Sequence, residues 1–184
     1  MKISKLAVAL TVAIFSCFFN YIAHAQLQPS GLKIVLGGDI INPATSEFIA
    51  ESIKQAENGK FRFIIIGLDT PGGLLGSTRD IVKSIMSSKV PVITYVSPMG
   101  ARAGSAGVFI TLASHIAAMA PSTNIGAAHP VSVGGEPARP GILDQISGKL
   151  EKGNRTPEEE KVVSDSKAWA ESIATERGRN PQWA

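Results

Sequence analysis

The sequence predicts an α/β domain built on a mainly parallel sheet, and two observations carry that prediction. Short apolar runs alternate with helical patterns along the chain, and a turn rich in glycine follows each apolar run, which is typical of an α/β fold. A length of 184 residues, with 44% hydrophobic and 18% charged residues, fits one globular domain with enough interior to fold alone.

The first 25 residues have the pattern of a signal peptide. A short basic start precedes an almost entirely apolar run at residues 6–22, and Ala23-His24-Ala25 gives the small-x-small pattern of a signal-peptidase site. We therefore expect an exported protein, periplasmic or on the outer side of the cytoplasmic membrane. The alternative is an uncleaved membrane anchor, because the apolar run is nearly long enough to span a bilayer. Cys17 is the only cysteine, so after cleavage disulfides and cysteine-based sites are excluded.

Three apolar runs in the first half predict buried strands, at residues 32–36, 61–68 and 92–96. Between the first two, a helix is expected to begin near Asn42, where Pro43 follows a capping residue. A second helix is expected over residues 75–87.

In the second half, a helix is expected from about Ala103 and a short strand at residues 116–119. Residues 131–155 carry glycines, prolines and scattered charges, and predict a mobile loop. Thr156, followed by proline and two acids, predicts the start of a long helix that ends at Gly178.

Two glycine-rich turns follow two different predicted strands, at Pro71-Gly72-Gly73 and around Ser105. In a parallel sheet both turns lie at the carboxyl edge, the usual place for a site. A serine at a strand-to-helix junction lies beside free backbone N–H groups, which favour negative charge on a carbonyl oxygen. The pattern therefore indicates acyl transfer, with tight packing of glycines as the alternative. A phosphate site is disfavoured, because neither turn carries a Gly-Lys-Ser/Thr or G-x-G-x-x-G pattern.

Four segments in this order resemble the NfeD family, membrane-bound serine proteases of the ClpP class that are distantly similar to signal peptide peptidase A. They are "LDTPGG" (68–73), "ARAGSAGVFI" (101–110), "MAPSTNIGAAHPV" (119–131) and "SIATERGRN" (172–180). The resemblance covers nearly all of the chain after residue 31. It implies a ClpP/crotonase-like spiral of β-β-α units and a peptidase activity.

The same resemblance implies roles for four residues. Ser105 matches the nucleophile, and the backbone N–H groups of Gly73 and Ala106 match the oxyanion hole. Lys161 matches the general base of a serine–lysine pair. A lysine acts as a base only when burial or a nearby cation lowers its pKa toward roughly 7 to 8. Without the resemblance, a lysine in "EEEK" would be taken as a solvated helix residue.

His129 is the alternative base, because the soluble ClpP proteases place a histidine at a similar spacing after the nucleophile. A histidine base needs an acid to orient it, and nothing in the sequence selects Asp144 or Asp165 for that role. We expect His129 to line the site and assign no role to His115. Asp69 is expected to fix the turn that follows it, and neither a metal nor a cofactor is expected.

Together with the signal-peptide pattern, the resemblance implies an exported serine endopeptidase that cleaves apolar segments of membrane-associated proteins. The resemblance implies a stomatin-like membrane partner, and the fold favours a homo-oligomer; a net charge of +3 without a basic patch disfavours nucleic acid. Relatives continue past the Gly-Arg-Asn motif, so the protease domain at residues 26–184 is expected to be incomplete at its carboxyl end. The alternatives are an inactive truncated relative that acts as a membrane-associated binding module, and a crotonase-type enzyme acting on an acyl-CoA thioester. The signal peptide and the serine both disfavour the second.

Overall fold

The computed structural model describes Phe15, residues 31–126 and residues 157–183. The chain divides into two units, Met1–Ser30 and Gly31–Ala184, and the description below concerns the second. The predicted signal segment (apart from Phe15), the predicted loop at 131–155 and His129 lie outside the described residues. Among the helices that are described, none has the length and apolar character needed to cross a membrane.

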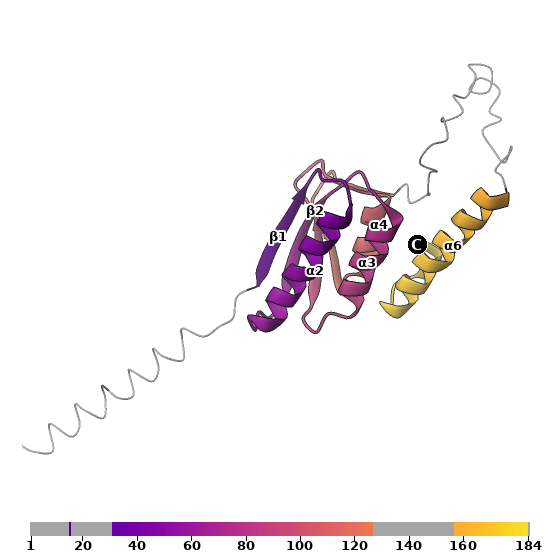
Figure 1. Ribbon diagram of the computed structural model, residues 1–184. Helices are drawn as coiled ribbons and strands as arrows, with labels where there is room; N and C mark the ends of the chain where they lie inside the picture. The colour runs from indigo at the N-terminus through magenta and orange to yellow at the C-terminus, as the bar shows by residue number, and fades with distance from the viewer. Residues whose placement is uncertain (1–14, 16–30, 127–156, 184) are drawn as a thin grey trace, which may run out of the picture. The chain divides into compact units, whose positions relative to one another are not determined.

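The main sheet has four parallel strands in the order β1-β2-β3-β5 (Figure 1). Their bounds are β1 (Leu32–Gly37), β2 (Ile64–Asp69), β3 (Val92–Val96) and β5 (Ile116–Met119). A small parallel sheet joins β4 (Arg102–Gly104) to β6 (Asn124–Gly126). Since all strands of the main sheet run in one direction, the segments that follow them gather at one edge.

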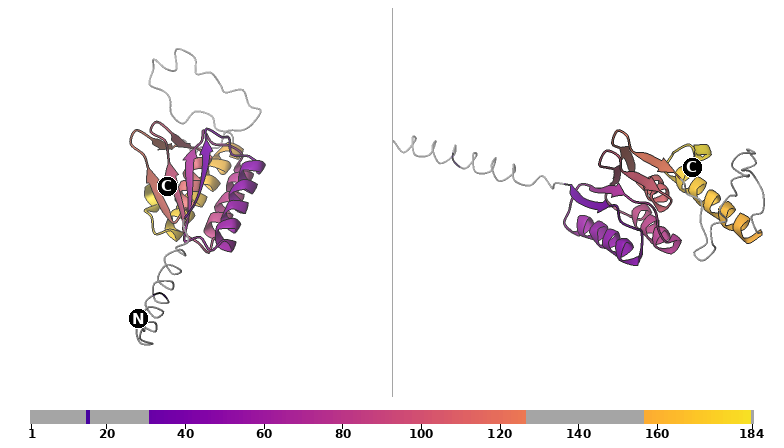
Figure 2. Two further views of the ribbon diagram at one scale, coloured as in Figure 1. Left: turned by 90° about the vertical axis from the view of Figure 1, so that its left-hand side faces the viewer. Right: turned by 90° about the horizontal axis from the view of Figure 1, so that it is seen from above.

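The helices are α2 (Pro43–Asn58), α3 (Leu75–Met86), α4 (Ala106–Ala113) and α6 (Pro157–Glu176), with a short 3₁₀ turn at Pro181–Trp183. Helix α2 begins as its sequence predicts, because the Asn42 side chain accepts a hydrogen bond from the Thr45 N–H at 3.0 Å and proline occupies the first turn. The strands form a layer beside α2 and α3 (Figure 2).

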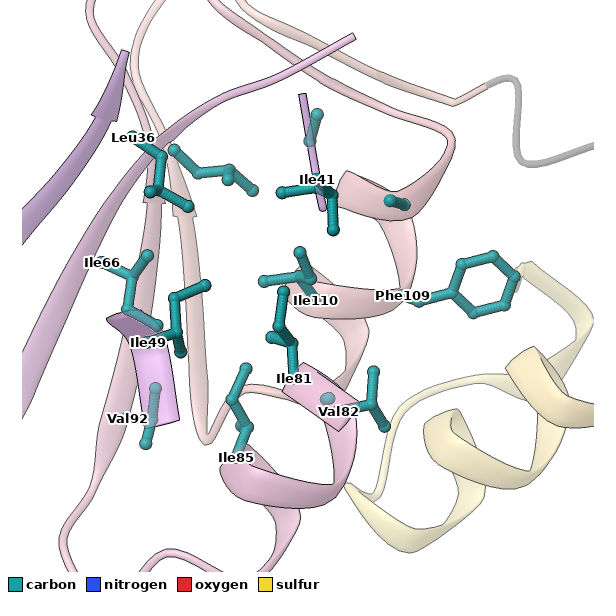
Figure 3. Packing of buried hydrophobic residues seen from close by; sticks show 14 of the residues in the cluster. Leu36, Ile41, Ile49, Ile66, Ile81, Val82, Ile85, Val92, Phe109 and Ile110 are labelled. Carbon is teal, nitrogen blue, oxygen red and sulfur yellow. The ribbon is translucent and has the colours of Figure 1, made fainter. Parts of the chain in front are cut away.

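The core lies between the sheet and the helices. Ile66 of β2, Ile49 of α2, Ile81 of α3 and Ile110 of α4 are fully buried and point toward a common centre (Figure 3). Burial of these branched apolar side chains supplies the main favourable term in folding. The core therefore ties the sheet to the three helices that follow its strands.

The face of the sheet opposite the helices carries exposed apolar side chains. Val35, Tyr95 and Ile116 are 58%, 39% and 53% exposed, and they belong to β1, β3 and β5. Val35 and Tyr95 stand level with Gly67 between them. Parallel sheets are usually covered on both faces, so this face is unusual within the described residues.

Two predicted boundaries are wrong. The helix expected from Ala103 begins only at Ala106, because Ala103 pairs with Ile125 in the small sheet. The strand expected over 61–68 begins at Ile64, because the Phe61 N–H bonds back to the end of α2. The first difference comes from a distant partner that local patterns do not reveal, whereas the second comes from a backbone bond to the Ala56 carbonyl in the last turn of α2.

Candidate active site

The turns after β2 and around Ser105 lie side by side at the carboxyl edge of the sheet. Thr70 pairs with Ala103 as in a parallel sheet: the Thr70 N–H donates to the Arg102 carbonyl at 2.8 Å, and the Gly104 N–H donates to the Thr70 carbonyl at 2.9 Å. The Asp69 carboxylate accepts from the Arg102 N–H at 3.0 Å. These bonds bring together the two glycine-rich turns that the sequence predicts as one site.

The Thr70 hydroxyl holds the first turn in shape. It donates to the Asp39 carbonyl at 2.6 Å and accepts from the Gly72 N–H at 3.1 Å, and the side chain is fully buried. Asp69 was expected to fix this turn, but its carboxylate bonds to the second turn instead. The sequence reasoning missed Thr70; its place directly after a buried strand and before Pro-Gly was the available signal.

Glycine is required at positions 72 and 73, because neighbouring atoms lie too close to leave room for a side chain. Gly72 has a φ of +121°, and a Cβ there would lie 2.6 Å from the Cβ of Ser105. A Cβ on Gly73 would lie 2.0 Å from the Ile41 carbonyl oxygen. Any side chain at either position would therefore push the turn away from Ser105 or from Ile41.

Ser105 has a strained backbone at the junction of β4 and α4. Its φ is +46° and its ψ is −105°, a region that non-glycine residues rarely adopt, at a cost of about 1–3 kcal/mol. Its N–H donates to the Gly126 carbonyl at 3.0 Å, and its side chain does not cap the helix. Such strain collects at functional sites, where the surrounding structure imposes it.

Two backbone N–H groups beside Ser105 are available to a ligand. The Ile41 N–H donates to the Gly72 carbonyl, and the Leu74 N–H donates to the Ile41 carbonyl. The Gly73 N–H lies between these two groups and therefore points away from Ile41. Ala106 opens α4, and a first-turn N–H has no acceptor inside its helix. Within residues 31–126 and 157–183, neither N–H donates to a protein acceptor.

Lys161 lies in the second turn of α6 and its side chain is exposed. Among the described residues it makes no hydrogen bond to Ser105, so the structure does not bring the two together. Lys161 nevertheless lies near the amino end of α6, as Ser105 lies at the amino end of α4. Trp169 of α6 stacks on Phe109 of α4 at 4.4 Å between ring centroids, as the middle of one helix meets the middle of the other.

The ends of these helices confirm their direction. The Arg177 Nε, at the end of α6, donates to the Ala113 carbonyl at the end of α4 at 2.6 Å. Helices α4 and α6 therefore run in the same general direction, and their amino ends face the same edge of the sheet.

The remaining candidates are not at this edge, or lie outside the described residues. His115 lies between α4 and β5, where its Nδ1 accepts from the Val92 N–H at 3.1 Å. Burial, with smaller contributions from Arg177 and Arg179, lowers the pKa of His115. Asp165 forms an ion pair with Arg79 at 2.6 Å. His129 and Asp144 lie in the part of the chain that the structure does not describe.

Exposed apolar side chains occur in the segments that form this edge. They belong to the segment after β1, the first turn and start of α3, the loop after β3, the end of β5 and the small sheet: Ile40, Leu74, Leu75, Met99, Met119 and Ile125. A ligand with apolar side chains would find complementary surface here.

Comparison with protein families gives a match over most of the chain. The sequence model of the family described as NfeD1b, N-terminal domain, matches residues 35–179. The membrane-bound protease PH1510 of Pyrococcus horikoshii is 42% identical over 128 residues, which cover 70% of this chain and 26% of that protein. The membrane protein NfeD1b of Bacillus subtilis is 30% identical over 159 residues, 84% of this chain and 36% of that one. The matched region thus spans between about a quarter and about a third of these relatives.

Comparison with solved structures agrees with the family match. A serine-to-alanine mutant of the 1510-N membrane-bound stomatin-specific protease aligns with a TM-score of 0.69 and 34% identity, over 85% of this chain and 69% of that one. A lysine-to-alanine mutant of that protease, in complex with a substrate peptide, aligns with the same TM-score over 64% of its chain. ClpP1 of Listeria monocytogenes aligns with a TM-score of 0.55 at 19% identity, over 82% of this chain and 75% of its own. The predicted ClpP-like α/β fold is confirmed.

Proposed function

This chain belongs to the NfeD1b N-terminal domain family, and on that premise we propose that it is a serine endopeptidase with Ser105 as its nucleophile. The observation that carries the proposal is the strained backbone of Ser105 beside two N–H groups without protein acceptors in the described chain. The existence of a serine mutant and a lysine mutant of a related protease supports a serine–lysine pair.

In the proposed reaction the Ser105 Oγ attacks the carbonyl carbon of the scissile bond while its proton passes to the Lys161 Nζ. The N–H groups of Gly73 and Ala106 hold the resulting oxyanion. Collapse of the intermediate breaks the C–N bond, and the leaving amine takes the proton from Lys161. Water, deprotonated by the neutral lysine, then hydrolyses the acyl-enzyme.

Lys161 has to approach Ser105 for this chemistry. The later turns of α6 are held on α4 by Trp169 and Arg177, whereas Lys161 lies in the exposed first turns. We therefore assign the approach to the amino-terminal part of α6.

The proposed substrates are apolar segments of membrane-associated proteins, and the exposed apolar side chains around the site support this choice. Because the related 1510-N protease is described as stomatin-specific, we propose a stomatin-like partner. The relatives are membrane proteins. From the predicted signal segment we propose that this chain is exported, either to the periplasm or to the outer side of the cytoplasmic membrane. The open apolar sheet face supports a homo-oligomer.

The alternative is an inactive relative that binds its partner without cleaving it. The exposed position of Lys161, which makes no hydrogen bond to Ser105 in the described part of the chain, favours this alternative.

Turnover of a fluorogenic apolar peptide by residues 26–184, from about pH 6 to about pH 10, tests the proposal. Ser105→Ala and Lys161→Ala should abolish turnover and His129→Ala should retain it, with circular dichroism confirming that each variant is folded. Loss with His129→Ala but not with Lys161→Ala would move the base to histidine. A folded but inert parent chain would favour the binding module.

A further inference from the structure

The segment Arg177-Gly178-Arg179 has a structural role that the proposed reaction does not yet use. Helix α6 ends in a Schellman motif: the Gly178 N–H donates to the Thr175 carbonyl at 3.0 Å and the Arg179 N–H to the Ala174 carbonyl at 2.8 Å. Gly178 has a φ of +65°, a conformation that favours glycine. This reversal of the chain lets both arginine side chains turn back toward the rest of the domain.

Both side chains bind the carboxyl ends of other helices. Arg179 donates through Nη2 to the Ser114 carbonyl at 2.9 Å and through Nη1 to the Leu112 carbonyl. Arg177 donates to the Ala113 carbonyl at the end of α4 and, at 3.3 Å, to the Ile85 carbonyl at the end of α3. The carbonyls at the end of α4 lie where a helix leaves its last acceptors without intrahelical donors, whereas the Ile85 carbonyl also accepts from the Ser88 N–H at 3.3 Å. The cations also complement the negative ends of the helix dipoles.

A second attachment lies in the middle of α6. The Trp169 ring stacks on Phe109 and carries the Arg79 guanidinium 4.5 Å from its centroid. Two attachments fix the direction of a helix axis. The end clamp and the aromatic stack, with the exposed Asp165–Arg79 ion pair one turn after Lys161, therefore determine together where the amino-terminal turns of α6 point.

We propose that Arg177 and Arg179 are positioning residues for the active site: by clamping the end of α6 to α3 and α4, they set where Lys161 lies relative to Ser105. The inference rests on the proposed serine–lysine reaction. Lys161 lies 16 residues before Arg177, or about 24 Å along a helix at about 1.5 Å per residue. If the clamp is lost, the helix pivots on the Trp169 stack, about 12 Å from Lys161. A tilt of about 10° would then move Lys161 by about 2 Å, whereas catalysis is sensitive to displacements of about 1 Å.

A double-mutant cycle on the full chain tests this role. Arg179→Gln should lower kcat at least about tenfold with KM changed less than about twofold, because the clamp is remote from the bound substrate. Because Lys161→Ala has no turnover, the cycle is closed on the rate at which a fluorophosphonate labels Ser105. Arg179→Gln should slow this labelling in the wild-type background and have no further effect in the Lys161→Ala background, since Arg179 acts through Lys161. Lys167→Gln removes an exposed cation from the same helix and should leave kcat unchanged. Arg179→Lys keeps the charge but loses the fork that spans two carbonyls, so it should be intermediate.

Equal losses in both backgrounds would mean a general loss of folded protein and would overturn the positioning role. A direct measurement keeps the inference separate from the proposed activity. Spin labels are attached to cysteines introduced by Lys161→Cys and Asp80→Cys in the Cys17→Ala chain. Double electron–electron resonance then measures the distance between α6 and α3. Arg179→Gln should broaden or shift that distance distribution. An unchanged distribution would overturn the inference whether or not the wild-type chain cleaves peptides, and an inert wild type with a shifted distribution would overturn only the proposed function.

Discussion

A Cβ placed on Gly72 would lie 2.6 Å from the Cβ of Ser105, which is closer than two such atoms approach in folded proteins. The turn after β2 is therefore fitted directly against the proposed nucleophile. Ser105 keeps its strained backbone in a space that only a glycine neighbour leaves open. The geometry of the site thus depends on residues with no chemical role of their own.

Gly72→Ala is expected to abolish turnover and to lower the free energy of unfolding by about 1–3 kcal/mol, through the clash and the positive φ. Gly76→Ala is the matched control, because a Cβ at Gly76 meets nothing within 4 Å and the residue lies in α3. It should leave turnover unchanged and raise stability by up to about 1 kcal/mol. Urea unfolding and peptide turnover measure both. Full activity of Gly72→Ala would show that the turn does not shape the site.

Thr70→Val should cost about 1–3 kcal/mol of stability, because the buried Gly72 N–H and the partly buried Asp39 carbonyl both lose their partner. Turnover should fall as well, since the turn that presents Gly73 loses its internal bond. Thr70→Ser keeps the hydroxyl and should retain more of both properties. If the valine and serine variants behave alike, the methyl group rather than the hydroxyl is what matters at this position.

His115→Asn should reduce the decrease in the free energy of unfolding that occurs as the pH is lowered. The pKa of His115 is lowered in the folded protein, first by burial and then by Arg177 and Arg179, so the unfolded chain binds the proton more readily. The contribution of neutral His115 to the free energy of unfolding should be fully present above about pH 6.5 and should be lost as the pH drops below that value. An asparagine oxygen can accept from the Val92 N–H without titrating. Parallel urea midpoints for both proteins between about pH 8 and about pH 5 would contradict the assignment.

Tyr95→Lys should weaken self-association, because it places a charge in the middle of the open apolar sheet face. Phe48→Lys is the control: Phe48 is 47% exposed but belongs to α2, on the helical side of the sheet. Sedimentation velocity should show a shift toward monomer for the first variant alone. An effect of equal size from Phe48→Lys would place the contact elsewhere, and a monomeric parent chain would remove the homo-oligomer proposal.

Much of the fold follows from local patterns. The buried strands β1 and β3 and the capped start of α2 lie where the sequence places them, because each depends on apolar periodicity or on a cap within a few residues. Helix α6 ends within two residues of Gly178, where glycine is the residue that can close the motif. The glycine-rich turns were also predicted to meet, since parallel strands share an edge.

Apart from the start of β2, the missed features depend on long-range contacts. The pairing of β4 with β6 joins segments of three residues that are too short to show a period. The acceptors of Arg177 and Arg179 lie more than 60 residues earlier in the chain, so no local pattern reveals the clamp. Thr70 bonds to a carbonyl 31 residues away. In each case the residue type was visible in the sequence, but the partner was fixed only by the fold.

Covalent labelling of the folded chain with a fluorophosphonate, followed by mass spectrometry, asks most directly whether Ser105 is an activated nucleophile. One adduct should form on Ser105; it should be absent in Ser105→Ala and should form much more slowly in Lys161→Ala. A folded protein that takes no label, or takes it on another residue, would contradict the assignment of Ser105.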